Sequence, residues 1–144
     1  MDHYKKSAVI IKAAAVADYR PKVSSTEKIK KGKNTLYLEL EKNPDIIAEL
    51  GKNKGKRILV GFAMETQNLM ANATEKLKKK NMDLIVANNL HEEGAGFRTD
   101  TNIITIIDRR GKAEKLERMN KLDAADEILS RVRKLLKKKS DGNR

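Results

Sequence analysis

Three short apolar segments, separated by helix-like segments, constrain the fold of this chain most strongly. The apolar segments are Ser7–Ala17, Arg57–Phe62 and Met82–Ala87. Nearly continuous apolar runs of this length are typical of strands buried on both faces of a parallel sheet. Amphipathic helical patterns follow at Asn43–Gly51 and Gln67–Lys80. The alternation predicts an α/β fold, with a Rossmann-like, mostly parallel sheet flanked by helices.

The ends of the first helical pattern are marked by residues with suitable local chemistry. Asn43 is placed to cap the helix, Pro44 suits its first position and Asp45 favours its positive end. Gly51 is placed to end it. Asn81 is the corresponding stop of the second helix. The backbone N–H groups at the helix start also form a weak candidate site for an anion.

The remaining segments predict a flap, a hairpin and a last helix. Pro21 is expected to end regular structure before a long polar flap, and Thr35–Glu41 alternates like a strand with one solvated face. Apolar alternation on both sides of Arg109-Arg110-Gly111 predicts a C-terminal hairpin. A periodic pattern from Leu122 to Leu136 predicts a helix, which Asn120 is placed to cap.

The composition narrows the functions to consider. There is no cysteine, which excludes disulfides, thiol catalysis and thiolate metal sites, and only two histidines, so no metal ligand is assigned. The net charge of +12 favours polyanionic ligands. With 3% aromatic residues, a nucleic-acid interface built on base stacking is disfavoured. No apolar run reaches the ~18 residues of a membrane span. The absence of cysteine fits a cytoplasmic protein, which is the location we expect.

The positive charge is concentrated at the C-terminal end. Seven Arg or Lys residues and one Asp lie between Arg131 and Arg144. We expect a domain at residues 1–136 and a disordered basic tail at residues 137–144.

A candidate ligand site lies where predicted strands end. Ligands of open parallel sheets bind outside the C-terminal strand ends. Ala17-Asp18, Phe62-Ala63 and Asn88-Asn89 each follow a predicted strand and are expected at one edge. Taken alone, Asp18 is equally a ligand acceptor or a turn residue, and Phe62 is either a stacking or a core residue.

Lysines form a second group of candidates. One of Lys28, Lys30 and Lys31 in the flap could neutralise a triphosphate, although solvated side chains are favoured for the last two. Lys76 and Lys80 share a helix face and suit either neighbouring phosphates or a solvated surface. The glycine-rich GxGxxG and GxxxxGK[ST] phosphate loops are absent from the sequence.

Six blocks, in one consistent order over about residues 7–136, carry a family resemblance. They are KAAAVADYRP, EKIKK, KNPDII, VGFAMET, the block from Lys76 to Asn88, and GFRTDTN. They resemble phosphopantothenoylcysteine synthetase. The resemblance is strongest to the C-terminal part of a bifunctional coenzyme A biosynthesis flavoprotein, which joins this synthetase to phosphopantothenoylcysteine decarboxylase.

The resemblance implies a CTP-dependent ligase that joins 4′-phosphopantothenate to cysteine through an acyl-cytidylate. CTP is then a co-substrate, and Mg²⁺ and lysines stabilise the charge on its phosphates. The resemblance assigns FMN only to the decarboxylase domain, which is expected to be absent from this chain. A homodimer is implied as well. The nucleotide-binding residues that it implies, with Lys28 as the catalytic one, are Ala13, Ala14, Asp18, Lys28, Pro44, Asp45, Ile46, Ile47, Phe62, Lys76 and Lys80.

The chain departs from the family pattern at its start. The family's Gly-Gly-Thr turn and Asn-x-Ser-Ser-Gly segment are absent. We therefore expect a fragment that holds the nucleotide half-site, has little or no synthetase activity and exposes a sheet edge where the first family strands are missing. Two alternatives remain. One is a basic module that binds nucleic acid, and the other is a different Rossmann-like nucleotide-binding domain, such as an oxidoreductase.

Overall fold

The computed structural model describes residues 3–31, 35–65, 68–89 and 100–141. These residues form two compact units, one made of Met1–Ala13 with Ile47–Arg144 and the other of Ala14–Ile46. Each unit is described by itself.

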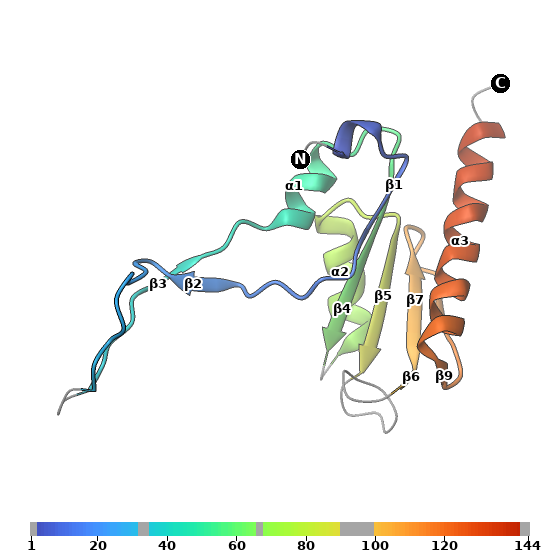
Figure 1. Cartoon of the computed structure of the whole chain (residues 1–144). Coiled ribbons are helices and arrows are strands. Elements are labelled where there is room, and N and C mark those ends of the chain that lie inside the picture. The colour runs from blue at the N-terminus through green and yellow to red at the C-terminus, as the bar shows by residue number, and fades with distance from the viewer. Residues whose placement is uncertain (1–2, 32–34, 66–67, 90–99, 142–144) are drawn as a thin grey trace. The chain divides into compact units, whose positions relative to one another are not determined.

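The larger unit is built on a five-stranded sheet with the order β1-β4-β5-β7-β8 (Figure 1). Strands β1, β4 and β5 are mutually parallel, whereas β7 and β8 are added in antiparallel fashion. The predicted mostly parallel α/β sheet is therefore confirmed. The strands are β1 (Val9–Lys12), β4 (Ile58–Glu65), β5 (Leu84–Asn89), β7 (Ile104–Asp108) and β8 (Ala113–Lys115).

Helices cover both faces of this sheet, and strand alternation divides the core between them. Leu59 and Ala63 of β4 belong to the cluster of α1 (Ile46–Lys52) and α2 (Leu69–Lys79). Ile58 and Val60 belong to the cluster of α3 (Lys121–Asp141). Figure 1 shows α3 beside β7, with α2 across the sheet. The short η1 (Tyr4–Lys6) precedes β1.

The predicted first strand is shorter and less buried than expected. It covers only Val9–Lys12 of the expected Ser7–Ala17 and is half-buried, because β1 has a single neighbour, β4, in the described sheet. The predicted hairpin is confirmed in β7 and β8, and Gly111 has a φ of 81° in its turn. A further pair, β6 (Thr101–Asn102) with β9 (Met119–Asn120), was not predicted.

The smaller unit contains a two-stranded antiparallel ribbon, β2 (Tyr19–Pro21) with β3 (Leu40–Lys42). Pro21 was expected to end regular structure, but it pairs with Leu40 as the last residue of β2. Proline is tolerated there because a ribbon edge does not need its N–H. The strand expected over Thr35–Glu41 is reduced to Leu40–Lys42, since no further strand is described beside it.

Helix α1 begins later than predicted, at Ile46. Asn43 was expected to cap it, but its side-chain Nδ2 donates to the Ala17 carbonyl at 2.8 Å, and its backbone N–H donates to the Asp18 carbonyl at 2.8 Å. The amide therefore serves the ribbon base of the smaller unit. Pro44 and Asp45 precede the helix.

The last helix is longer than predicted. Helix α3 runs to Asp141, so residues 137–141 are helical and not a disordered tail, while residues 142–144 lie outside the described residues. The predicted cap is confirmed, because Asn120 Oδ1 accepts the Asp123 N–H at 2.8 Å. Asp123 Oδ2 in return accepts the Asn120 side-chain N–H at 2.7 Å.

Removing this cap with Asn120→Ala is expected to lower the free energy of unfolding by about 1 kcal/mol, because an N–H in the first turn of α3 loses its acceptor. Urea unfolding followed by circular dichroism measures the loss. Asn120→Ser is the control, since its hydroxyl restores the acceptor and most of the stability. Equal losses in both variants would contradict a capping role.

Candidate functional site

The predicted ligand edge is present in the larger unit. Strands β4 and β5 are parallel and in register from Val60 opposite Leu84 to Glu65 opposite Asn89, so both end at the same edge. Strand β1 runs in the same direction but ends earlier, with Lys12 opposite Gly61, four residues before the end of β4. Figure 1 shows the arrowheads of β4 and β5 together at this edge. The edge has the location at which open α/β sheets bind ligands.

Two asparagine side chains meet at this edge. Asn88 Nδ2, near the end of β5, donates to Asn102 Oδ1 of β6 at 3.3 Å, and the Ile103 N–H donates to the same oxygen at 3.0 Å. Phe62 and Met64 of β4 are 42% and 40% exposed. The edge thus combines amide groups with accessible apolar side chains. Spacing alone did not identify Asn102, since only the antiparallel return of the chain brings it beside Asn88.

The predicted site residues are divided between the two units. Ala14, Asp18 and Lys28 lie in the smaller unit, where all three are exposed. Phe62, Lys76 and Lys80 lie in the larger unit, together with Ala13, which ends its first segment. Pro44 to Ile46 end the smaller unit, and Ile47 begins the second segment of the larger one. Each group is assessed within its own unit.

Within the larger unit, Phe62 and the two predicted lysines belong to different parts of the fold. Strand alternation assigns Phe62 to the face of Ile58 and Val60, which α3 covers. Lys76 lies in the last turn of α2, and Lys80 is its C-cap. Helix α2 covers the other face. The described contacts do not join Phe62 to either lysine.

The first helix presents one of its two predicted isoleucines to solvent and buries the other. Ile46 is 46% exposed, whereas Ile47 is 7% exposed and belongs to the core cluster beneath α1 and α2. The side chain of Ile47 is therefore a packing residue in the described structure.

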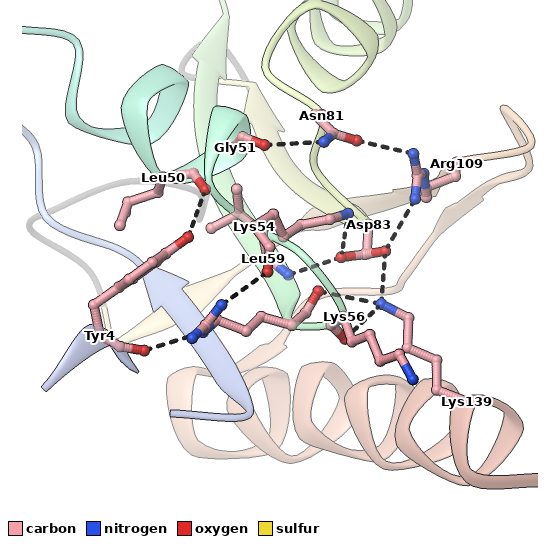
Figure 2. A network of polar contacts seen from close by, with 11 residues as sticks. Tyr4, Leu50, Gly51, Lys54, Lys56, Leu59, Asn81, Asp83, Arg109 and Lys139 are labelled. Carbon is pink, nitrogen blue, oxygen red and sulfur yellow. Dashed lines mark hydrogen bonds and ion pairs between the residues drawn. The ribbon is translucent and has the colours of Figure 1, made fainter. Parts of the chain in front are cut away.

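A buried ion pair lies at the opposite edge of the sheet (Figure 2). Lys54 Nζ and Asp83 Oδ2 are 2.9 Å apart, and both side chains are 3% exposed. The same carboxylate oxygen accepts the Leu59 N–H at 2.8 Å. The other oxygen faces Lys139 Nζ at 3.5 Å and Arg109 Nη1 at 3.6 Å. Asp83 therefore joins the start of β5 to β4, α3 and the hairpin.

Burial dominates the titration of Lys54. Desolvation lowers the pKa of its ammonium group below the usual 10.5, and Arg109 and Lys139 lower it further. The hydrogen bond and charge of Asp83 oppose this shift. This role could not be predicted from the sequence, because Lys54 lies in a lysine-rich segment that resembles a solvated turn. Its location away from the ligand edge makes the pair a structural element.

Tyr4 and Arg57 attach the N-terminal segment to the sheet beside this ion pair. The Arg57 guanidinium lies 4.5 Å from the centroid of the Tyr4 ring, and its Nε donates to the Tyr4 carbonyl at 3.0 Å. The Tyr4 hydroxyl donates to the Leu50 carbonyl at 3.0 Å. Figure 2 shows the hydrogen bond between Tyr4 and Leu50. These contacts fix η1 against both β4 and α1.

Comparison with known proteins gives consistent matches. Residues 1–136 match the family model of the DNA/pantothenate metabolism flavoprotein C-terminal domain. The coenzyme A biosynthesis bifunctional protein CoaBC of Bacillus subtilis is 48% identical over 93% of this chain and 33% of its own length. A cysteine/cysteine sulfinic acid decarboxylase from an unknown prokaryotic organism is 44% identical over 92% of the chain and 37% of its own length.

A solved structure extends the likeness to three dimensions. The crystal structure of the C-terminal domain of CoaBC superposes with a TM-score of 0.76 at 37% identity, over 95% of this chain and 59% of that one. The chain spans about a third of the length of the two curated relatives, the Bacillus subtilis protein and the decarboxylase. No helix in the described part of the chain is long and apolar enough to cross a membrane.

These comparisons correct the function expected from the sequence. The family is described as a flavoprotein, and one relative is named as a decarboxylase. The names reported above include no ligase, CTP or Mg²⁺. The prediction of a CTP-dependent ligase is therefore contradicted. Its predicted ligands, CTP, Mg²⁺, 4′-phosphopantothenate and cysteine, and its predicted homodimer are set aside with it. Coenzyme A biosynthesis and the flavoprotein connection remain, whereas the synthetase half is not shown.

The family description implies a flavin as the cofactor. A flavin mononucleotide needs a surface for its planar ring and donors for its phosphate. Among the described residues, the ligand edge offers one exposed aromatic ring, Phe62, and the sequence has no glycine-rich phosphate loop. This set does not fit the cofactor by itself, so no catalytic step is derived through a flavin.

The family assignment depends on the extent of the match. The family model covers residues 1–136 of this 144-residue chain. The fold is similar to that of the C-terminal domain of CoaBC, at 37% identity. The chain therefore belongs to the family of the C-terminal domain of DNA/pantothenate metabolism flavoproteins.

Proposed function

We propose that this chain acts in coenzyme A biosynthesis, as part of the C-terminal domain of a CoaBC-type flavoprotein, and that it binds phosphopantothenoylcysteine. The observation that carries the proposal is the family match over residues 1–136. The family description names pantothenate metabolism, and the Bacillus subtilis relative is named for coenzyme A biosynthesis. The cytoplasm is the proposed location.

The chemistry of the ligand edge supports a compound of this class. Phosphopantothenoylcysteine carries a phosphate, two amide groups and a cysteine carboxylate on a flexible chain. Asn88 and Asn102 supply amide groups that can exchange hydrogen bonds with such amides. Phe62 and Met64 supply apolar surface, and the net charge of +12 favours a polyanion.

Decarboxylation is proposed as an activity of the longer protein. It is the reaction named for one relative, of which this chain spans 37%. Because the described edge does not fit a flavin by itself, the role proposed for this chain is to bind the compound.

Calorimetric titration of this chain tests the proposal. Phosphopantothenoylcysteine is expected to bind at least about tenfold more tightly than pantothenoylcysteine, because charge-assisted bonds to the phosphate are lost in the second compound. Asn88→Ala is expected to weaken binding about two- to tenfold, as for one uncharged hydrogen bond. Asn53→Ala is the matched control, because Asn53 lies after α1 and bonds only to Glu49.

Two results would contradict the proposal. One is equal affinity for the phosphorylated and unphosphorylated compounds, and the other is equal weakening by Asn88→Ala and Asn53→Ala. A parallel assay supplies FMN and measures carbon dioxide released from phosphopantothenoylcysteine. Release is expected from Bacillus subtilis CoaBC as the positive control and not from this chain, whereas release from this chain would assign the decarboxylation to it.

A further inference from the structure

A cavity of about 290 Å³ lies between the β7–β8 hairpin and α3. Its lining includes Leu84 and Asp108, the first residue of β5 and the last of β7. Because β5 is parallel to β4, Leu84 lies at the opposite end of the strands from the ligand edge. The cavity is therefore separate from the candidate site described above.

The inner wall of this cavity is apolar. Leu84 and Ile106 are each 3% exposed and line it, and Leu135 of α3 lines it from the other side. All three belong to the core cluster on the α3 face or pack against it. A ligand in the cavity would therefore contact the edge of the hydrophobic core, so aliphatic groups are favoured there.

The outer wall carries an excess of positive charge. Four basic and two acidic side chains line the cavity. Arg131 is held by Glu114 at 2.8 Å and by Glu127, and it lowers the pKa of the Glu114 carboxyl group. In the part of the chain that the structure describes, Lys112, Lys134 and Lys138 form no salt bridge. Three ammonium groups are thus available at the rim of one apolar cavity.

These features define a ligand with two parts. A water molecule in the liquid occupies about 30 Å³, so the cavity has room for about ten groups of that size. Three lysines favour a dianionic group over a single charge. We propose that this cavity binds a phosphate monoester of a short aliphatic chain, with the chain against Leu84, Ile106 and Leu135 and the phosphate at Lys134 and Lys138.

Titration of the whole chain with butyl phosphate, hexyl phosphate and inorganic phosphate tests this site. Methyl NMR signals of Leu84, Ile106 and Leu135 report on the cavity. Hexyl phosphate is expected to shift all three and to bind at least about tenfold more tightly than butyl phosphate, because each buried methylene contributes about fourfold. Inorganic phosphate is expected to leave these signals unchanged.

The lysines are tested separately from the apolar wall. Lys134→Ala/Lys138→Ala is expected to weaken hexyl phosphate binding about three- to tenfold. Lys78→Ala/Lys79→Ala is the matched control, which removes the same charge from α2 and is expected to change the affinity less than twofold. Both pairs are exposed, so the fold is retained.

Three outcomes would overturn the proposal. They are affinity independent of chain length, equal weakening by the two lysine pairs, and methyl shifts confined to Met64 at the ligand edge. The first two outcomes concern only the edge opposite to the ligand edge, and so they leave the test of phosphopantothenoylcysteine binding unaffected.

Discussion

Asp83→Asn is expected to lower the free energy of unfolding by about 3–5 kcal/mol, the cost of leaving a buried charge without its partner. Lys54 and Asp83 are each 3% exposed, with Nζ and Oδ2 2.9 Å apart. Asparagine keeps an oxygen for the Leu59 N–H, which Asp83 Oδ2 now accepts at 2.8 Å. The substitution therefore isolates the loss of the negative charge. Urea unfolding followed by circular dichroism measures it.

The pH dependence of this loss has a defined sign. Burial already lowers the pKa of Lys54 below 10.5 in the folded chain. Between the pKa of Lys54 in the folded chain and 10.5, the unfolded chain binds more protons at this lysine than the folded chain does. The contribution of Lys54 to the free energy of unfolding therefore rises with pH in this range. In Asp83→Asn the ammonium group has no counter-ion, so the pKa of Lys54 falls further. The deficit is expected to shrink as the pH rises from this lower pKa to the pKa of Lys54 in the parent chain.

Two controls separate the buried pair from ion pairs in general. Glu49→Gln breaks the exposed pair with Lys52, whose atoms are 3.9 Å apart, and is expected to cost less than about 1 kcal/mol. Lys54→Met/Asp83→Asn removes the unpaired ammonium group as well and is expected to recover most of the lost stability. If Asp83→Asn costs no more than Glu49→Gln, the buried pair does not stabilise the contacts among β4, β5, α3 and the hairpin.

The sequence predicted those parts of the fold whose cause is local or periodic. The apolar runs that became β4 and β5 are long enough to require burial on both faces, and the Asn120 cap depends on residues three positions apart. The edge where these strands end follows from their parallel direction. These inferences need only short-range pattern and the geometry of parallel sheets.

The parts that were missed depend on contacts distant in the sequence. Lys54 was indistinguishable from its exposed lysine neighbours until the fold placed Asp83, 29 residues away, beside it. Asn102 reaches Asn88 only through the antiparallel return into β7. In the smaller unit the error is the reverse. The alternating pattern of Thr35–Glu41 predicted a longer strand than the observed β3, which pairs only with β2 in the described sheet. Side-chain pattern alone does not specify such partners.

Gly51→Ala is expected to lower the free energy of unfolding by about 3 kcal/mol, the upper end for overpacking a well-packed site. Gly51 was expected to end α1, but α1 continues to Lys52, and among the described glycines those with positive φ are Gly55 and Gly111. Its role is close approach. A Cβ atom at position 51 would lie 2.0 Å from the Lys80 carbonyl oxygen and 2.9 Å from its carbon.

Helix propensity alone predicts the opposite sign, since alanine is favoured over glycine inside a helix by about 1 kcal/mol. The clash outweighs this gain because the new Cβ atom would meet backbone atoms, which cannot move aside as a side chain can. The backbone is also held in place on the other side of the contact. Asn81 follows Lys80 with a φ of 51°, and its side chain donates a 2.9 Å hydrogen bond to the Gly51 carbonyl (Figure 2).

Gly61→Ala is the control. Its Cβ atom would meet Met82 Sδ at 2.4 Å and Ile47 Cδ1 at 2.6 Å. Both are ends of flexible side chains, so a smaller loss of about 1 kcal/mol is expected. A Gly51→Ala variant more stable than the parent chain in urea would show that α1 and Lys80 can separate without cost.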